Sequence, residues 1–228
     1  MTEVLSAMPS ALALYAKAAA TARRKPKGKP QIPALDARMD NVRADAAKLA
    51  AYNKVCGFEP GEQLPITYPQ VMIAALHMHL MSNAAFPLPM LGLVHVRNHI
   101  EQTRALRADE SFTVNVRTGE SRDVRQGLEF DIHTEFSAGE ETPWRSVMTI
   151  LYRMKGPKGQ AKAPPVPAPA LAEYRNFDAP ADIGRRYAKV SGDHNPIHTS
   201  AVGAKLFGFP RAIAHGMWTL ARVTALVG

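Results

Sequence analysis

Apolar and polar residues alternate along the middle of the chain. In residues 128–136 (LEFDIHTEF) alternate positions are apolar, Thr excepted, and residues 112–116 show the same pattern. Residues 91–100 and 147–154 are also strand-like. A period of two buries one face of a strand and leaves the other in water, as in an antiparallel sheet. We therefore predict an antiparallel sheet built from these segments.

A strongly apolar segment precedes the predicted strands. Residues 70–82 (QVMIAALHMHLMS) are hydrophobic almost all round, as in a helix that other structure encloses. Pro69 is well placed as the first helical residue. Polar, helix-like sequence lies upstream, from about residue 31. One buried helix followed by antiparallel strands predicts a sheet wrapped around that helix.

A proline-rich segment divides the chain. Residues 155–170 (KGPKGQAKAPPVPAPA) contain too many prolines for a helix interior or a central strand, so we predict an extended linker. The linker separates a first unit, residues 31–154, from a second unit, residues 171–228. Residues 1–30 form a basic N-terminal arm outside both units.

The second unit has a different pattern from the first. It begins with strand-like residues 174–177, followed by an amphipathic helix over residues 180–190. A polar turn, residues 191–198, leads to a short helix over 199–207, and an apolar helix covers 217–226. No strand-like segments follow that helix, so the second unit is expected to be half a domain.

Composition identifies a globular chain. The chain has 228 residues, of which 46% are hydrophobic and 21% charged. These values exclude a mainly disordered, collagen-like or coiled-coil protein. There is a single cysteine, Cys56, so an intramolecular disulfide is impossible. No apolar run approaches the roughly 18–20 residues of a membrane span, and we expect a cytoplasmic protein.

The positive charge is unevenly distributed. The formal net charge is +8, but much of the excess lies in the first 30 residues. We expect this segment to be a solvated, partly helical arm, although its basic, acid-poor character also resembles a mitochondrial presequence. Nucleic-acid binding is not favoured, because no base-stacking aromatic residues accompany the charges. The basic residues of the arm are Lys17, Arg23, Arg24, Lys25, Lys27 and Lys29.

The polar turn carries the candidate chemistry. Asp193 and His198 lie on either side of Asn195 and Pro196, and the proline prevents a regular helix from running through the turn. Both side chains can therefore point at one place and share one water molecule as an acid–base pair. Gly216 begins the last helix, where free N–H groups favour a developing anion. This combination suits chemistry through an enolate-like intermediate.

Other interpretations of these residues are open. Asp193 alone is typical of a turn or capping residue, and His198 or His215 alone is typical of a structural histidine. Together with His194 they also form a candidate metal cluster. Their spacing matches no zinc motif and no cysteine joins them, so we expect neither a metal nor a cofactor.

The turn and the segment after it resemble a known family. The sequence YAKVSGDHNPIH, followed by GFPRAIAHGM, is similar to the signature of MaoC-like hydratases and dehydratases, the (R)-specific enoyl-thioester hydratase group of the hot-dog fold. Residues 64–98 resemble the N-terminal hot dog of two-domain members of the 3-hydroxyacyl-thioester dehydratase type. The resemblance covers about residues 31–228 and implies an α+β fold with a complete N-terminal hot dog.

The resemblance also implies roles for individual residues. Asp193 and His198 would activate water for addition to a trans-2-enoyl thioester carried by CoA or a carrier protein, or catalyse the reverse dehydration. The N–H of Gly216 would bind the thioester oxygen. Four residues would support them: Ser191, Asn195, His215, which fixes the loop, and Thr224, a hydroxyl behind the site.

The first hot dog has a supporting role under this resemblance. It lacks the Asp/His pair and would help to accommodate the acyl chain. We interpret its apolar helix, residues 71–80, as core rather than as the wall of an acyl tunnel.

One feature departs from the family pattern. Family members continue past the central helix into strands that complete the second sheet, and this sequence shows none. Residues 217–226 would then expose an apolar face, so we expect a truncated second hot dog that a homodimer mate or another chain completes. The alternative function is a non-catalytic thioester-binding or heterodimer-forming hot-dog subunit.

Overall fold

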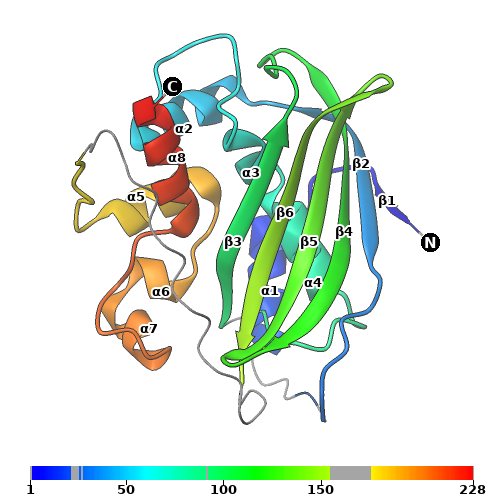
Figure 1. Cartoon of the computed structure of the whole chain (residues 1–228), viewed down its shortest axis with the longest axis vertical. Helices are drawn as coiled ribbons and strands as arrows, with labels where there is room; N and C mark the ends of the chain where they lie inside the picture. The colour runs from blue at the N-terminus through cyan, green and yellow to red at the C-terminus, as the bar shows by residue number, and fades with distance from the viewer. Residues whose placement is uncertain (1, 22–25, 27, 91, 155–175, 228) are drawn as a thin grey trace.

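A six-stranded sheet lies beside a group of helices and is drawn on the right in Figure 1. The computed structural model describes residues 2–21, 26, 28–90, 92–154 and 176–227. The strand order is β1-β2-β4-β5-β6-β3, with β1 parallel to β2 and every other pair antiparallel. The strands are β1 (Glu3–Leu5), β2 (Asp36–Arg43), β3 (Leu93–Gln102), β4 (Ser111–Val124), β5 (Gly127–Ala138) and β6 (Glu141–Arg153). The antiparallel strands predicted between residues 91 and 154 are therefore confirmed.

Helices cover one face of this sheet. Helix α4 (Ala74–Ser82) contacts β2 and β4, and α1 (Ala11–Thr21) packs on α4. The inward residues Phe130, Ile132 and Phe136 of β5 are fully buried, while their neighbours face outward. Hydrophobic burial of this inner face, at about 25 cal/mol per Å² of apolar surface, holds the helices against the sheet.

The apolar segment at residues 70–82 forms two helices rather than one. Helix α3 (Tyr68–Met72) ends at Ile73, whose φ of −116° and ψ of 15° leave the helical region, and α4 begins at the next residue. Ile73 itself is fully buried. The apolar pattern predicted the burial correctly, but a pattern of side chains cannot show a local change of backbone direction.

Part of the N-terminal arm is folded. Strand β1 pairs with β2, and α1 buries Leu14, Ala18 and Thr21 on one side. The helix α1 confirms the helical part of the expected arm, whereas its complete solvation is not confirmed, because these three residues are buried. These three buried residues recur at helical spacing, whereas Lys17 on the other side is exposed. The charge cluster that suggested solvation lies after this helix.

Strand β2 was not predicted, because its alternation is interrupted. The register with β4 shifts between Met39 and Val42, and Asn41 has a φ of 58°. Such a bulge breaks the period of two. The polar helix expected in the same region is α2 (Ala46–Cys56), which the side chain of Asp45 caps and Gly57 ends at a φ of 82°.

The second unit consists of helices beside the β3 edge of the sheet (Figure 1). They are α5 (Ile183–Ser191), α6 (Pro196–Thr199), α7 (Ala201–Leu206) and α8 (Gly216–Val227). The helices predicted at 180–190, 199–207 and 217–226 are confirmed as α5, α7 and α8, whereas α6 lies mostly within the segment predicted as a polar turn, residues 191–198. The linker, residues 155–170, and the first half of the strand predicted at 174–177 lie outside the described residues, and residues 176–177 are not in a strand.

The two units share one hydrophobic core. Ile183 and Tyr187 of α5 and Trp218 of α8 belong to the same buried cluster as the inner face of the sheet. The indole N–H of Trp218 donates to the carbonyl of Val55 in α2 at 3.1 Å. Within the parts of the chain that are described, no helix is long and apolar enough to cross a membrane.

Candidate active site

The polar turn joins α5 to α6 with residues suited to each position. Gly192 ends α5 at a φ of 74°, a left-handed conformation that glycine adopts without a steric cost. Asn195 caps α6 by accepting from the N–H of Ile197, and Pro196 follows in the first turn of α6. Asp193 is held between these two helix ends.

Asp193, His198 and His215 come together at this turn. One carboxylate oxygen and one nitrogen from each ring all lie within 4.8 Å of one another. The Nδ1–H of His198 donates to the carbonyl of Ile213 at 2.9 Å, which leaves Nε2 as the basic nitrogen. The two imidazole rings stack with their centroids 3.8 Å apart.

His215 positions Asp193 and stays neutral. Its Nε2–H donates to the backbone carbonyl of Asp193 at 3.0 Å. Burial lowers the pKa of His215 to about 4, and the nearby Asp193 carboxylate, which raises the pKa, offsets only part of this effect. The expected loop-fixing role of His215 fits this geometry.

The same three side chains fit hydrogen bonding better than metal coordination. The lone pairs of an imidazole lie in the plane of its ring, so two stacked rings cannot both direct a lone pair at one ion. Nδ1 of His198 and Nε2 of His215 are also engaged with carbonyls. The geometry therefore favours an acid–base site.

Ser191 and Asn195 lie where the sequence placed them. The Ser191 hydroxyl donates to the Tyr187 carbonyl at 2.9 Å and accepts from the N–H of Asp193 at 3.2 Å. The N–H of Asn195 donates to the Asp193 carboxylate at 3.1 Å. Both residues restrict the position of the carboxylate.

Gly216 and Thr224 differ in their relation to the site. Gly216 is the first residue of α8 and lines the same cavity as Asp193 and His198, and its N–H has no partner inside the helix. Thr224 does not line that cavity, and its hydroxyl donates to the Leu220 carbonyl in its own helix at 2.9 Å. The Thr224 hydroxyl therefore does not lie behind the site, where it was expected.

Asp193, His198 and His215 line a cavity of about 410 Å³. Its walls come from α1, α3, α4, β3, β6 and the turns of the second unit. Val71, Ala74 and Met78 line it, so one side of the apolar segment 70–82 is a cavity wall and not only core. The wall is rich in methionine and includes Met78, Met81, Met90, Met148 and Met217.

Sequence reasoning missed four polar residues that line this cavity: Tyr15, Gln70, His77 and His95. A histidine inside an apolar helix, as at position 77, was the available signal. His95 sits at a register shift between His95 and Arg97, which places it and its neighbour Val94 in the wall together. No local pattern indicated Tyr15, because its partners are about 180 residues away.

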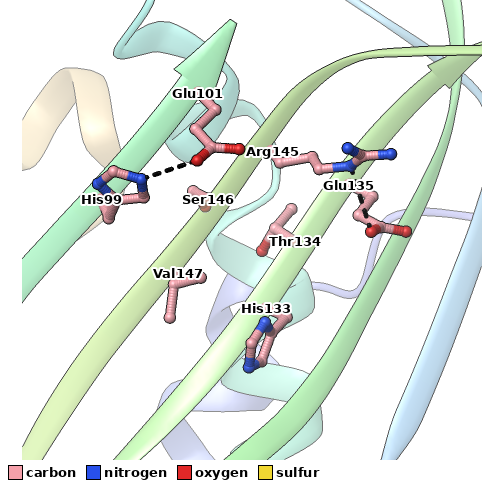
Figure 2. A pocket seen from close by; sticks show the side chains of 8 residues that line it. All are labelled: His99, Glu101, His133, Thr134, Glu135, Arg145, Ser146 and Val147. Carbon is pink, nitrogen blue, oxygen red and sulfur yellow. Dashed lines mark hydrogen bonds and ion pairs between the residues drawn. The ribbon is translucent and has the colours of Figure 1, made fainter.

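A second, smaller hollow lies on the outer face of the sheet (Figure 2). His99 pairs with Glu101 at 3.0 Å and Arg145 with Glu135 at 3.5 Å. These side chains are largely exposed and already paired along the surface. They offer no convergent group comparable to the first cavity.

Comparisons with known proteins identify the family. The family description "MaoC like domain" matches residues 162–228. The chain is 40% identical over 220 residues to 3-hydroxyacyl-thioester dehydratase X of Mycobacterium tuberculosis, covering 95% of this chain and 78% of that protein. The chain belongs to the MaoC-like dehydratase family. The family resemblance of the turn is thus confirmed.

Solved structures agree with this assignment. A crystal structure of HtdX from Mycobacterium tuberculosis matches with a TM-score of 0.73 at 39% identity, covering 83% of this chain and 77% of that one. A MaoC-like dehydratase from Phytophthora capsici matches with a TM-score of 0.62 at 17% identity, over 88% and 74% of the two chains, and supports the fold alone. The expected α+β hot-dog-like fold is confirmed.

The close approach of α5 to α6 predicts an effect of substituting Gly184. A Cβ atom there would lie 1.9 Å from the backbone oxygen of His198, so Gly184→Ala must displace the turn that carries this histidine. Overpacking of this kind costs about 1–3 kcal/mol of unfolding free energy, measurable by urea denaturation. Gly61→Ala, where a Cβ meets nothing within 4 Å, is the matched control. Equal stability of the two variants would contradict the prediction.

The buried histidines predict a pH dependence of stability. Burial lowers the pKa of His77 to about 3 and that of His215 to about 4, against about 6.5 in an unfolded chain. As the pH falls from about 6.5 towards 4, only the unfolded state takes up these protons. The free energy of unfolding should therefore fall, by up to about 1.4 kcal/mol per pH unit for each histidine.

In the variant His77→Gln, the free energy of unfolding should fall less steeply as the pH is lowered, because one of the two buried histidines is absent. Urea denaturation at several pH values measures this slope. Gly61→Ala, which changes no titratable group, is the control and should keep the wild-type slope. A wild-type slope in His77→Gln would refute the assignment.

Proposed function

We propose that the chain is a hydro-lyase that reversibly hydrates trans-2-enoyl thioesters to (R)-3-hydroxyacyl thioesters. The carrying observation is the Asp193–His198 pair at an apolar cavity, beside the start of α8, in a chain of the MaoC-like dehydratase family. The substrate class is supported by the name of the relative, 3-hydroxyacyl-thioester dehydratase X. The acyl group is attached to CoA or to a carrier protein.

The spacing of the pair suits one water molecule. A water that hydrogen-bonds two groups at about 2.8 Å each holds them about 4–5 Å apart. A carboxylate oxygen of Asp193 and a ring nitrogen of His198 lie within 4.8 Å of each other. One water molecule can bridge two groups at such a separation.

Hydration follows from these positions. His198 Nε2 accepts a proton from the bridging water as the water oxygen bonds to C3 of the enoyl thioester. The C2–C3 π electrons move towards the thioester carbonyl, forming an enolate. The proton then passes to C2, which restores the neutral imidazole, and the Asp193 carboxylate stabilises the transient imidazolium. Dehydration runs the same steps in reverse.

The enolate oxygen would be stabilised at the start of α8. Gly216 presents an N–H that no carbonyl of the helix satisfies, at the positive end of the helix dipole. Gly216 lines the cavity, so this end of the helix faces the space that the substrate would occupy. Such a donor stabilises the transition state more than the neutral thioester.

The first unit would supply the acyl-binding wall. One side of α4 and the inner residues of β3 and β6 enclose the cavity with apolar side chains. Methionine side chains are flexible and polarisable, so a methionine-rich wall adapts to an acyl chain. In this arrangement the first hot dog binds the chain and the second carries the chemistry.

The acid–base assignment predicts the effect of two substitutions. Asp193→Asn and His198→Ala should each lower the rate of crotonyl-CoA hydration about 10²–10⁴-fold, because each removes a proton-transfer or charge-stabilising group. The loss of absorbance of the enoyl thioester measures the rate. Asp182→Asn, a substitution outside the cavity, is the control and should keep wild-type activity. Full activity in either site variant would refute the mechanism.

The cavity wall predicts a change of acyl-chain preference. Ala74→Leu narrows the cavity, so kcat/KM for dodecenoyl-CoA should fall about tenfold while crotonyl-CoA is retained. Ala75→Leu, at the next residue of α4 and outside the lining, should leave both values unchanged. An unaltered ratio of the two substrates in Ala74→Leu would show that the acyl chain lies elsewhere.

A second candidate function is that of a non-catalytic thioester-binding or heterodimer-forming subunit. In this case a partner chain would complete the second hot dog. Val223 and Val227 on α8 are 43% and 74% exposed, which favours further structure against this helix. Hydration by the purified chain, abolished by Asp193→Asn, would decide for the enzyme. Acyl-CoA binding without turnover would decide for the subunit.

A further inference from the structure

The four backbone groups nearest Asp193 form hydrogen bonds with side chains and, among the described residues, not with other backbone groups. Residues 192–195 lie between α5 and α6 and belong to neither helix. Four backbone groups flank the aspartate: the Gly192 carbonyl, its own N–H and carbonyl, and the His194 N–H. Each has a side-chain partner, and the partners come from three different elements.

Tyr15 of α1 holds two of the four groups with a single hydroxyl. Its O–H donates to the Gly192 carbonyl at 2.6 Å and accepts from the His194 N–H at 2.7 Å. The hydroxyl thus spans the residue on each side of Asp193. Ser191 and His215 hold the other two groups.

The position of Tyr15 is itself fixed by packing. Leu14 and Ala18 are each 2% exposed, and α1 packs on α4. Burial of the tyrosine raises its pKa, so the hydroxyl remains protonated and able to donate near neutral pH. The ring also contacts His194 edge-on, with 6.1 Å between centroids.

We propose that Tyr15 is a positioning residue for hydration, which fixes the backbone of Asp193 so that its carboxylate meets the bridging water. This proposal rests on the proposed function, and it makes the N-terminal segment a component of the active site. A displacement of about 1 Å in such a group can cost about a hundredfold in rate, so the two hydrogen bonds act on turnover.

The test is Tyr15→Phe, which removes the hydroxyl and keeps the ring. We expect kcat for crotonyl-CoA to fall about tenfold or more, with KM changed less than about twofold. Tyr152→Phe is the matched control, because it removes a tyrosine hydroxyl from β6 at a residue that does not line the cavity. The control should keep the wild-type kcat.

Two further measurements separate positioning from general stability. Hydrogen exchange of the His194 amide should accelerate about tenfold or more in Tyr15→Phe, while amides of β5 remain protected as in wild type. In an Asp193→Asn background, Tyr15→Phe should lower the residual rate little, because the group it positions is already inactive.

The outcomes distinguish the two proposals. A wild-type kcat in Tyr15→Phe, or a full additional loss in the Asp193→Asn background, would overturn the role of Tyr15 and leave the hydratase function intact. Absence of hydration by the wild-type chain would overturn the function instead. Even in that case, an unchanged hydrogen-exchange rate of the His194 amide in Tyr15→Phe would overturn the claim that Tyr15 holds the turn.

Discussion

The site depends on how one short turn is held. Asp193 must present its carboxylate at a fixed place, yet the turn lies between two helix ends and has no ladder of backbone bonds of its own. Side chains from α1, α5 and the segment before α8 supply the missing partners. A hydrogen bond of this kind contributes about 0.5–1.5 kcal/mol net, so the contacts together stabilise one arrangement of the turn over others.

His198 and His215 have different roles because their surroundings differ. His198 donates one N–H to a backbone carbonyl and keeps its other nitrogen as a base at the cavity. His215 is buried beneath it and stays neutral, so it holds the turn without adding a second positive charge next to a transient imidazolium. The two rings have the same chemistry, so their roles follow from their different hydrogen bonds and from the burial of His215.

The cavity joins the two units into one working structure. Its polar end comes from the second unit, whereas its apolar wall comes mainly from α4, β3 and β6 of the first. Their shared core holds the two contributions together. An enoyl thioester is itself divided in this way, with a polar reacting end and an apolar chain, so the arrangement matches the proposed substrate.

The sequence by itself determined strands β3 to β6, the helices predicted at 180–190 and 217–226, and the proximity of Asp193 and His198. These features are local: a period of two, a helical period, and a proline that turns the chain between two reactive residues. The family signature placed Gly216 for the same reason, since its spacing is read along the chain.

Only the tertiary structure decided which residues surround that pair. Tyr15 and His194 are 179 positions apart, and His77 and Thr134 are 57 apart, so no periodicity could relate them. The break at Ile73 and the bulge in β2 likewise depend on packing against neighbours. The N-terminal segment looked solvated because its charge was visible in the sequence, whereas the partners that bury its helix were not.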